Sequence, residues 1–237
     1  MNHPTNNPAK DKLIVALDVP GYDEARKLVE TLGDTVSFYK IGLELLFSEG
    51  LALASELDNE GKRVFLDMKF LDIGNTVEKA VAGVANLGFD FLTIHGTDTK
   101  TIKAAVKGRG NSSLKLLAVT VLTSLDQTDL NEQGIAMTPS ELVLKRAKLA
   151  RDAGIDGVIA SGQEAAAIRD TAGPDFLIVT PGIRLPGGDA GDQKRITTPE
   201  DAIRNGANHI VVGRPINAAR NALEAAQTFL GHLSRAT

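Results

Sequence analysis

Short runs of apolar and β-branched residues alternate with longer amphipathic segments along the whole chain. About eight of these runs have the length and composition of buried strands. They are LIVALDV (13–19), SFYKIG (37–42), RVFLDMK (63–69), FLTIHG (91–96), LKLLAVTVL (114–122), GVIA (157–160), FLIVTPGI (176–183) and HIVVGR (209–214). Strands that alternate with helices build a parallel sheet, and about eight such units predict an α/β fold closed into a (β/α)8 barrel of the TIM type.

Helical patterns fill the segments 22–33, 75–88 and 138–154, and each of them ends in glycine, a residue favoured where a helix stops. The third segment also begins clearly, with Thr138 as N-cap, Pro139 in the first turn and Glu141 completing a capping box. An open, doubly wound sheet is the alternative architecture. It is disfavoured because PGYDE follows the first strand, where a dinucleotide-binding sheet would carry a GxGxxG motif.

The chain is long enough for one sizeable core and contains no recognisable linker. We therefore expect one catalytic barrel domain over residues 12–237. Residues 1–11, MNHPTNNPAKD, are expected to form a flexible polar lead-in.

Charged residues interrupt three apolar runs near their ends. Residues two apart in a strand share a face, so Phe65, Asp67 and Lys69 point to one side and the apolar residues between them to the other. The same alternation gives Asp18 and Lys40 the corresponding positions in the first two runs. The uninterrupted apolar face suits the layer between strands and helices. The charges are then expected inside the barrel near its carboxyl end, where barrel enzymes carry out their chemistry.

Lys40, Asp67, Lys69 and Asp72 form a set that alternates in sign. A buried charge is costly unless it is paired, so the set is either a network of salt bridges that plugs the barrel or a reactive site. Three neighbouring strands that end in the same way favour a reactive site. His95 also faces inward, and it could either tie the set together or be a satisfied structural histidine.

The last strand-like run delivers Gly213 and Arg214 directly before a helical segment, which is the usual position of a phosphate site in barrels. Before it, the long glycine-rich stretch RLPGGDAGDQKRITTPE follows the seventh run. Loops of this length in a compact domain are often functional, so we expect a lid whose Gln193 and basic residues close over a phosphate. The alternatives are an arginine that caps the barrel mouth and a solvated surface loop.

Composition narrows the function further. The net charge of -4 and the scattered Lys and Arg residues give no basic stripe for a nucleic acid. Cysteine is absent, which removes disulfides, thiolate metal sites and a cysteine nucleophile, and fits a reducing cytoplasm. No signal peptide and no apolar stretch of roughly 18 residues is present, so we expect a cytoplasmic protein that does not cross a membrane.

The run FLDMKFLDIGNTV, with ALDV and FYKIG before it and TPGIR and VVGRPI after it, resembles bacterial orotidine 5′-phosphate decarboxylases over nearly the whole chain. The DxKxxD pattern within that run is specific to one superfamily of barrels. The resemblance implies decarboxylation of orotidine 5′-monophosphate to UMP by a homodimer with shared active sites, without a metal or an organic cofactor.

The resemblance also implies roles for individual residues. Lys69 would protonate C6 of the pyrimidine, Asp67 would lie beside the substrate carboxylate, and Lys40 and Asp72 would complete the charged array. The other substrate-binding residues that it implies are Asp18 and Lys40 at the ribose; Ile73 and Thr76, with Asp72, from the second subunit; Thr123 or Ser124 at the pyrimidine edge; and Pro181, Arg184, Gln193, Gly213 and Arg214 toward the phosphate and the lid.

Two other functions stay open. A magnesium-dependent sugar-phosphate enzyme of the same superfamily would share DxKxxD, but its second-strand position resembles a glutamate. Lys40 stands there in this chain, and a cation disfavours Mg²⁺, which prefers oxygen ligands. A non-catalytic phosphate or nucleotide sensor would need Arg214 but not the alternating charges.

Overall fold

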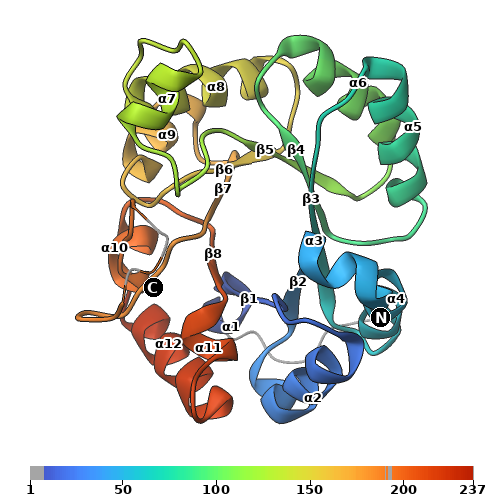
Figure 1. The fold of residues 1–237 in the computed structure, drawn as a ribbon, viewed down its shortest axis with the longest axis vertical. Helices are drawn as coiled ribbons and strands as arrows, with labels where there is room; N and C mark the ends of the chain where they lie inside the picture. Colours follow the sequence, from blue (N-terminus) through green and yellow to red (C-terminus); the bar gives the residue numbers. More distant parts are fainter. Residues whose placement is uncertain (1–7, 190, 192–193, 237) are drawn as a thin grey trace.

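The computed structural model describes residues 8–189, 191 and 194–236 of the chain. Within these residues, eight parallel strands close into a barrel in chain order, with β8 pairing back onto β1 (Figure 1). The strands are β1 (Leu13–Ala16), β2 (Phe38–Gly42), β3 (Arg63–Phe70), β4 (Phe91–His95), β5 (Lys115–Val119), β6 (Gly157–Ile159), β7 (Leu177–Thr180) and β8 (His209–Val212). The (β/α)8 barrel predicted from the alternating pattern is confirmed.

Helices surround the strands on the outside of the ring. They are α1 (Pro8–Lys12), α2 (Tyr22–Leu32), η1 (Gly33–Thr35), α3 (Leu43–Leu45), η2 (Leu46–Gly50), α4 (Leu51–Asn59), α5 (Gly74–Ala85), α6 (Thr99–Arg109), α7 (Gln127–Glu132), α8 (Pro139–Asp152), α9 (Ala165–Ala172), α10 (Pro199–Arg204), α11 (Arg214–Asn217) and α12 (Ala222–Ala236). Figure 1 shows α12 beside α1 and α2, with which it is in contact, so the first and last helices meet where the ring closes. No helix of the described residues is long and apolar enough to cross a membrane.

The helix boundaries follow local signals. Thr138 Oγ1 accepts a hydrogen bond from the Glu141 amide, and the Glu141 carboxylate accepts one from the Thr138 amide, which is the expected capping box ahead of α8. Pro139 occupies the first turn of that helix. Gly33 at the end of α2 and Gly154 after α8 have φ of 49° and 87°, a left-handed conformation that glycine adopts without a Cβ clash.

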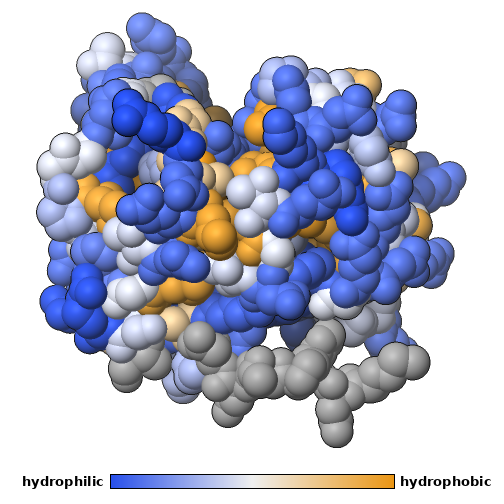
Figure 2. Space-filling model, turned by 90° about the horizontal axis from the view of Figure 1, so that it is seen from below, coloured by the Kyte–Doolittle hydropathy of each residue, from blue (hydrophilic) through white to orange (hydrophobic). Residues whose placement is uncertain are grey.

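Two apolar layers hold the barrel together. The larger one fills the space between strands and helices and contains Val64, Leu66 and Met68 of β3, as the period of two predicts. The smaller one lies inside the barrel and consists of Ile14, Ala16, Phe38, Phe65, Phe91, Leu117, Val179 and Val211. Hydrophilic side chains cover most of the molecular face in Figure 2, and hydrophobic ones show through mainly toward its centre, as expected when helices turn their polar sides outward.

Aromatic rings close the amino end of the barrel. The ring centroids of Phe38 and Phe91 are 5.1 Å apart, and those of Phe65 and Phe91 are 5.9 Å apart. The guanidinium of Arg63 lies 4.0 Å from the Phe38 ring centroid, and His209 packs edge-on against Phe38 and Phe91. This end is therefore filled, and any reaction has to take place at the carboxyl end.

The lead-in expected at residues 1–11 is wrong in its last four residues. Pro8–Lys12 form the helix α1, and its Ala9 is only 2% exposed. The polar composition hides this packing, because a single small apolar side chain is enough to dock one short turn against α12 and β8. Residues 1–7 lie outside the described part of the chain.

We predict that His209 makes the fold sensitive to acid. Burial and the nearby Arg63 guanidinium lower the pKa of His209 to about 4, and its Nδ1 lies 2.9 Å from the carbonyl oxygen of Asp11. In the unfolded chain the His209 imidazole takes up a proton as the pH falls through about 6.5, whereas in the native protein it does so only near pH 4. The contribution is therefore complete above pH 6.5 and is lost as the pH falls toward 4. The stability lost from this group is about 2 kcal/mol at pH 5.

Urea unfolding of wild type and His209→Gln at pH 7.5 and pH 5 measures this effect. The variant should lose less free energy of unfolding between the two pH values than wild type does. Equal losses in the two proteins would contradict the assignment, because His95 and the carboxylates are common to both.

Candidate active site

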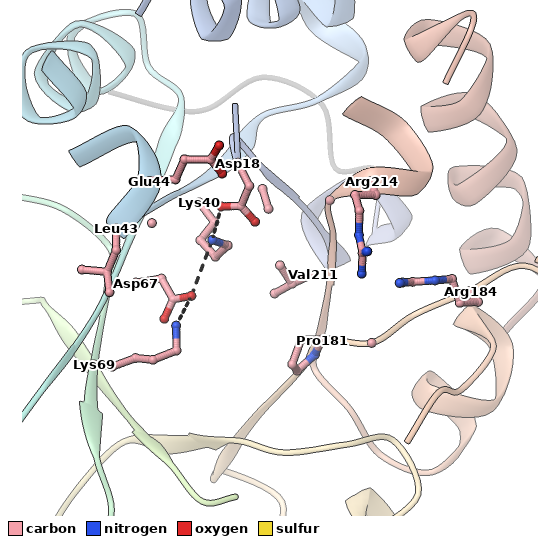
Figure 3. A pocket seen from close by; sticks show the side chains of 14 residues that line it. Asp18, Lys40, Leu43, Glu44, Asp67, Lys69, Pro181, Arg184, Val211 and Arg214 are labelled. Atoms are coloured by element: carbon pink, nitrogen blue, oxygen red, sulfur yellow. Dashed lines mark hydrogen bonds and ion pairs between the residues drawn. The ribbon is translucent and has the colours of Figure 1, made fainter. Parts of the chain in front are cut away.

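A chain of four alternating charges crosses the carboxyl ends of β1, β2 and β3. The Lys40 ammonium lies 2.8 Å from Asp18 Oδ1 and 3.5 Å from Asp67 Oδ2, and Asp67 Oδ2 lies 2.8 Å from the Lys69 ammonium (Figure 3). The sequence placed these residues on the inner face, and the structure brings all four together. Each carboxylate and each ammonium therefore has an opposite charge within ion-pair distance.

Burial and pairing compete over the charges of the two central residues. Burial alone would lower the pKa of the Lys40 ammonium, but the carboxylates of Asp67 and Asp18 outweigh it and hold that pKa above its ordinary value. Burial alone would raise the pKa of Asp67, but Lys40 and Lys69, with hydrogen bonds from Lys69 and Thr93, hold it below its ordinary value. Both groups are consequently ionised at neutral pH.

Lys69 has an unusual backbone conformation. Its φ is 50°, in the left-handed region that residues with a Cβ rarely adopt, and the register between β3 and β4 shifts between Leu66 and Phe70. Thr93 of β4 bridges this irregularity, because its hydroxyl accepts a hydrogen bond from the Lys69 amide at 2.9 Å and donates one to Asp67 Oδ1 at 2.8 Å. One buried hydroxyl thus fixes both the strained backbone and the carboxylate.

Sequence reasoning did not single out Thr93. The signal was available, because Thr93 lies between Phe91 and His95 on the inner face of β4. His95 itself is half-buried, and burial together with the Lys69 charge lowers its pKa. Among the described residues, no hydrogen bond joins His95 to the four charges, so it does not tie the set together in that way.

Two connected compartments meet at the charged chain. The polar compartment, about 510 Å³, is lined by Ala16, Asp18, Lys40, Gly42, Leu43, Glu44, Asp67, Lys69, Pro181, Gly182, Arg184, Val211, Gly213 and Arg214. The apolar compartment, about 200 Å³, is lined by Lys40, Phe65, Asp67, Lys69, Val119, Val121, Leu122, Thr123, Ser124, Ile159, Pro181 and Val211. Lys40, Asp67 and Lys69, with Pro181 and Val211, line both compartments, whereas Asp18 lines only the polar one. A ligand that fills the cavity therefore has its middle against the three shared charges.

Two arginines stand at the far end of the polar compartment (Figure 3). Arg184 is buried, and its guanidinium donates to the carbonyl oxygens of Asp189 at 2.6 Å and Ile183 at 2.9 Å. Arg214 is exposed and lies so close to Gly191 that a Cβ on that glycine would be 2.7 Å from Nη1. Their convergence suits an anionic group, as the sequence predicted for Arg214.

Three predicted residues stand apart from these compartments. Asp72, Ile73 and Thr76 lie in the loop after β3 and the first turn of α5, and all three are exposed. Asp72 Oδ1 accepts a hydrogen bond from the Ile73 amide at 2.6 Å. The single chain therefore does not bring them to its own charged array. Gln193, predicted for the lid, lies outside the described residues.

The described part of the chain contains no group of three or more His, Cys, Asp or Glu side chains arranged to hold a metal ion. In the charged chain the groups beside each carboxylate are ammonium ions.

The chain is similar to known proteins over most of its length. The family model described as "Orotidine 5'-phosphate decarboxylase / HUMPS family" matches residues 11–229. The orotidine 5′-phosphate decarboxylase of a Caulobacter species is 52% identical over 226 residues, covering 95% of this chain and 98% of that protein. The enzyme of the same name from Methylobacterium nodulans is 53% identical over 230 residues, covering 96% and 97%. The crystal structure of orotidine 5′-phosphate decarboxylase from Lactobacillus acidophilus superimposes with a TM-score of 0.81 at 38% identity, covering 94% and 99%.

We predict that Thr93→Val loosens the charged chain whereas Thr93→Ser does not. Valine removes the donor to Asp67 and the acceptor for the Lys69 amide, and a buried group left without its partner costs roughly 1–3 kcal/mol. The free energy of unfolding should fall accordingly, and the pKa of Asp67, followed by NMR, should rise. Serine keeps the hydroxyl, so equal behaviour of the two variants would contradict the bridging role.

Proposed function

Since the chain belongs to the orotidine 5′-phosphate decarboxylase / HUMPS family, we propose that it converts orotidine 5′-monophosphate to UMP in pyrimidine synthesis. The observation that carries the proposal is the chain Asp18–Lys40–Asp67–Lys69 at the junction of the two compartments. This position matches a substrate with a planar base at one end, a phosphate at the other and its reacting carbon between them.

The chemistry needs a fixed cation at the reacting carbon. When carbon dioxide leaves C6, the bonding electron pair stays on that carbon as a localised carbanion. Lys69, held 2.8 Å from Asp67, is an ammonium oriented before the reaction begins, and such preorganised charge stabilises a transition state without further reorganisation. The proton of Lys69 then passes to C6, which completes UMP and leaves a neutral amine.

Asp67 has a second effect in this proposal. Its pKa is held low, so it is a carboxylate when the substrate binds, and it lies beside the carboxylate that leaves. Its ion pair with the Lys69 ammonium holds that side chain in place. Lys40 balances its charge from the other side and, with Asp18, faces the space where the ribose would lie.

The lining of the two compartments supports a place for the rest of the substrate. The apolar compartment suits the pyrimidine ring, with Thr123 or Ser124 at its polar edge. Pro181 is at the junction of the two compartments. Arg184 and Arg214, with the backbone at Gly213, suit the phosphate, because arginine and phosphate form short charge-assisted hydrogen bonds.

The same geometry favours catalysis without a metal over the magnesium-dependent alternative. A divalent cation would have to displace the Lys40 or Lys69 ammonium from its carboxylate partners. Mg²⁺ prefers oxygen ligands in an octahedral arrangement, and the two ammonium groups offer none. We therefore assign the neutralising charge to the lysines. The cytoplasmic location stays a prediction from the sequence.

A homodimer with shared sites is supported by exposed apolar side chains. Phe47 is 87% exposed and Ile73 is 73% exposed, and Leu43 and Leu71 are about half exposed. These residues follow β2 and β3, two paired neighbours, at the carboxyl end that carries the site. Several large apolar side chains exposed at the same end of a protein are typical of a protein interface. Asp72, next to Ile73, would then enter the partner's cavity.

Decarboxylation is tested by the loss of ultraviolet absorbance of orotidine 5′-monophosphate with purified protein and EDTA. We expect full activity with the chelator. Lys69→Ala should lose several orders of magnitude in kcat, because general acid catalysis alone contributes roughly 10²- to 10⁴-fold and electrostatic stabilisation adds to it. An inactive wild type would reject the function, EDTA-sensitive activity would reject metal independence, and a variant with a tenth of the wild-type rate would reject the role of Lys69.

Shared sites are tested by mixing Lys69→Ala with Asp72→Ala protein after dissociation and reassociation. In each hybrid, one site takes Lys69 from one chain and Asp72 from the other and is intact, while the second site lacks both. Random exchange makes about half of the dimers hybrid, so roughly a quarter of the wild-type activity should return. If Asp72 serves its own chain, no site is restored although mass spectrometry detects hybrids.

A further inference from the structure

The segment Thr120–Ser124 leaves β5, and its residues Val121–Ser124 form one wall of the apolar compartment. Other elements hold this segment from behind. Four of its successive carbonyl oxygens accept hydrogen bonds from outside the segment. The donors are Arg146 Nη1 to Thr120 (2.6 Å), Arg195 Nη2 to Val121 (3.0 Å) and Leu122 (3.2 Å), and the Lys194 amide to Thr123 (3.2 Å). Because this segment has no regular secondary structure, these donors determine where its side chains lie.

Arg195 supplies two of these four contacts, and it is itself fixed by a buried ion pair. Its Nη1 lies 2.8 Å from Glu164 Oε1, and the two side chains are 10% and 4% exposed. Ser161 Oγ donates to the Arg195 carbonyl at 3.1 Å. Glu164 and Ser161 belong to the loop after β6, so one arginine joins the loops that follow β5 and β6.

The same arginine is tied to the phosphate side of the cavity through the chain itself. Two residues beyond it, Thr197 bridges to Ile183, and its carbonyl oxygen accepts a hydrogen bond from the Arg184 amide at 3.0 Å. The Thr197 amide in turn donates to the Gly182 carbonyl at 3.3 Å. Arg195 is therefore a short, hydrogen-bonded path away from Arg184.

Stability alone does not account for this pair. Within the described residues, Arg195 Nε and Glu164 Oε2 are buried and have no hydrogen-bond partner. A buried ion pair that is imperfectly satisfied contributes little to folding, and apolar residues of similar size are often as stable in its place. The contacts of Arg195 with Val121 and Leu122, by contrast, are specific to the wall of the compartment.

We propose that Arg195, oriented by Glu164, is a positioning residue that sets the wall Val121–Ser124 against the pyrimidine. The inference rests on the proposed function, because that function assigns the pyrimidine to the apolar compartment. Arg195 does not touch the substrate. It acts through the backbone that carries Thr123 and Ser124.

The decisive variant replaces both partners, Arg195→Met with Glu164→Leu, because neither then leaves an unpaired buried charge. We expect a melting temperature near that of wild type. We expect kcat to fall by roughly 10²-fold, since a misplacement of about 1 Å in a supporting residue can cost that much. The affinity for UMP should fall by roughly 10-fold while that for ribose 5-phosphate changes by less than about 2-fold, because only UMP fills the apolar compartment.

Arg195→Lys and Arg169→Met complete the experiment. Lysine keeps a positive charge beside Glu164 but lacks the second nitrogen with which Arg195 binds the carbonyls of Val121 and Leu122 while Nη1 holds Glu164. It should therefore give a smaller loss with the same preference for UMP. Arg169 binds the carbonyls of Gly173, Phe176 and Gly206 at the amino end of the barrel. Its methionine variant is the matched control, which should lower the melting temperature and leave kcat and UMP affinity unchanged.

Amide hydrogen exchange of the peptide covering residues 120–125 gives a readout that needs no ligand. Faster exchange in the double variant, with Arg169→Met unchanged there, supports the positioning role. Unchanged exchange and kcat in the folded double variant, or equal losses for UMP and ribose 5-phosphate, would overturn it. If the double variant does not fold, Arg195→Lys decides by the same measurements. A wild type without decarboxylase activity would reject the proposed function, whereas the exchange result would still judge the positioning role.

Discussion

Four charges placed at the mouth of an apolar barrel constrain everything around them. Each is stabilised only while its neighbours keep their distances, and Lys40 has to lie between Asp18 and Asp67 at once. The register of the first three strands sets these distances. Lys40 of β2 is paired with Ala16 of β1, and Asp67 of β3 is paired with Gly42 of β2. A slip by one residue would turn the charges into the layer beneath the helices, so the packed barrel interior and the charged chain specify the same register.

The backbone strain at Lys69 costs stability at a residue that belongs to the charged chain. A left-handed φ costs free energy for any residue with a Cβ and persists only when the surroundings determine it. Thr93 supplies part of that determination by binding the Lys69 amide and the Asp67 carboxylate together. The irregular register spans the stretch that carries both Asp67 and Lys69, whose side chains form an ion pair at 2.8 Å.

Period-two alternation was sufficient to predict the barrel and the inner position of Asp18, Lys40, Asp67 and Lys69, because both depend on residues close in sequence. The bulge at Lys69 leaves no such trace. Arg195 was hidden for a related reason, since a basic residue in a polar loop resembles a solvated one until its distant partner Glu164 is known. Alpha-helix α1 was missed because its burial rests on one alanine and on α12, more than two hundred residues later. Asp72 is a different case, because it lies apart from both compartments of its own chain, and the place proposed for it depends on a second chain.

The placement of the charges at the junction of two compartments also bears on how binding could assist the reaction. In the proposed binding mode, contacts at the two arginines are remote from the reacting carbon, and contacts with the wall after β5 are close to it. Binding energy from the remote end can hold the base against Lys69 only if both ends are rigid with respect to the charged chain. The bonds of Arg195 to the segment after β5, and the bridge between Thr197 and Ile183, provide that rigidity on the side opposite β1–β3. The ion pairs already orient the ammonium and carboxylate groups, so little charge has to reorganise as carbon dioxide departs. The free energy required to orient these groups was therefore supplied when the chain folded, and this cost is not repeated in each turnover.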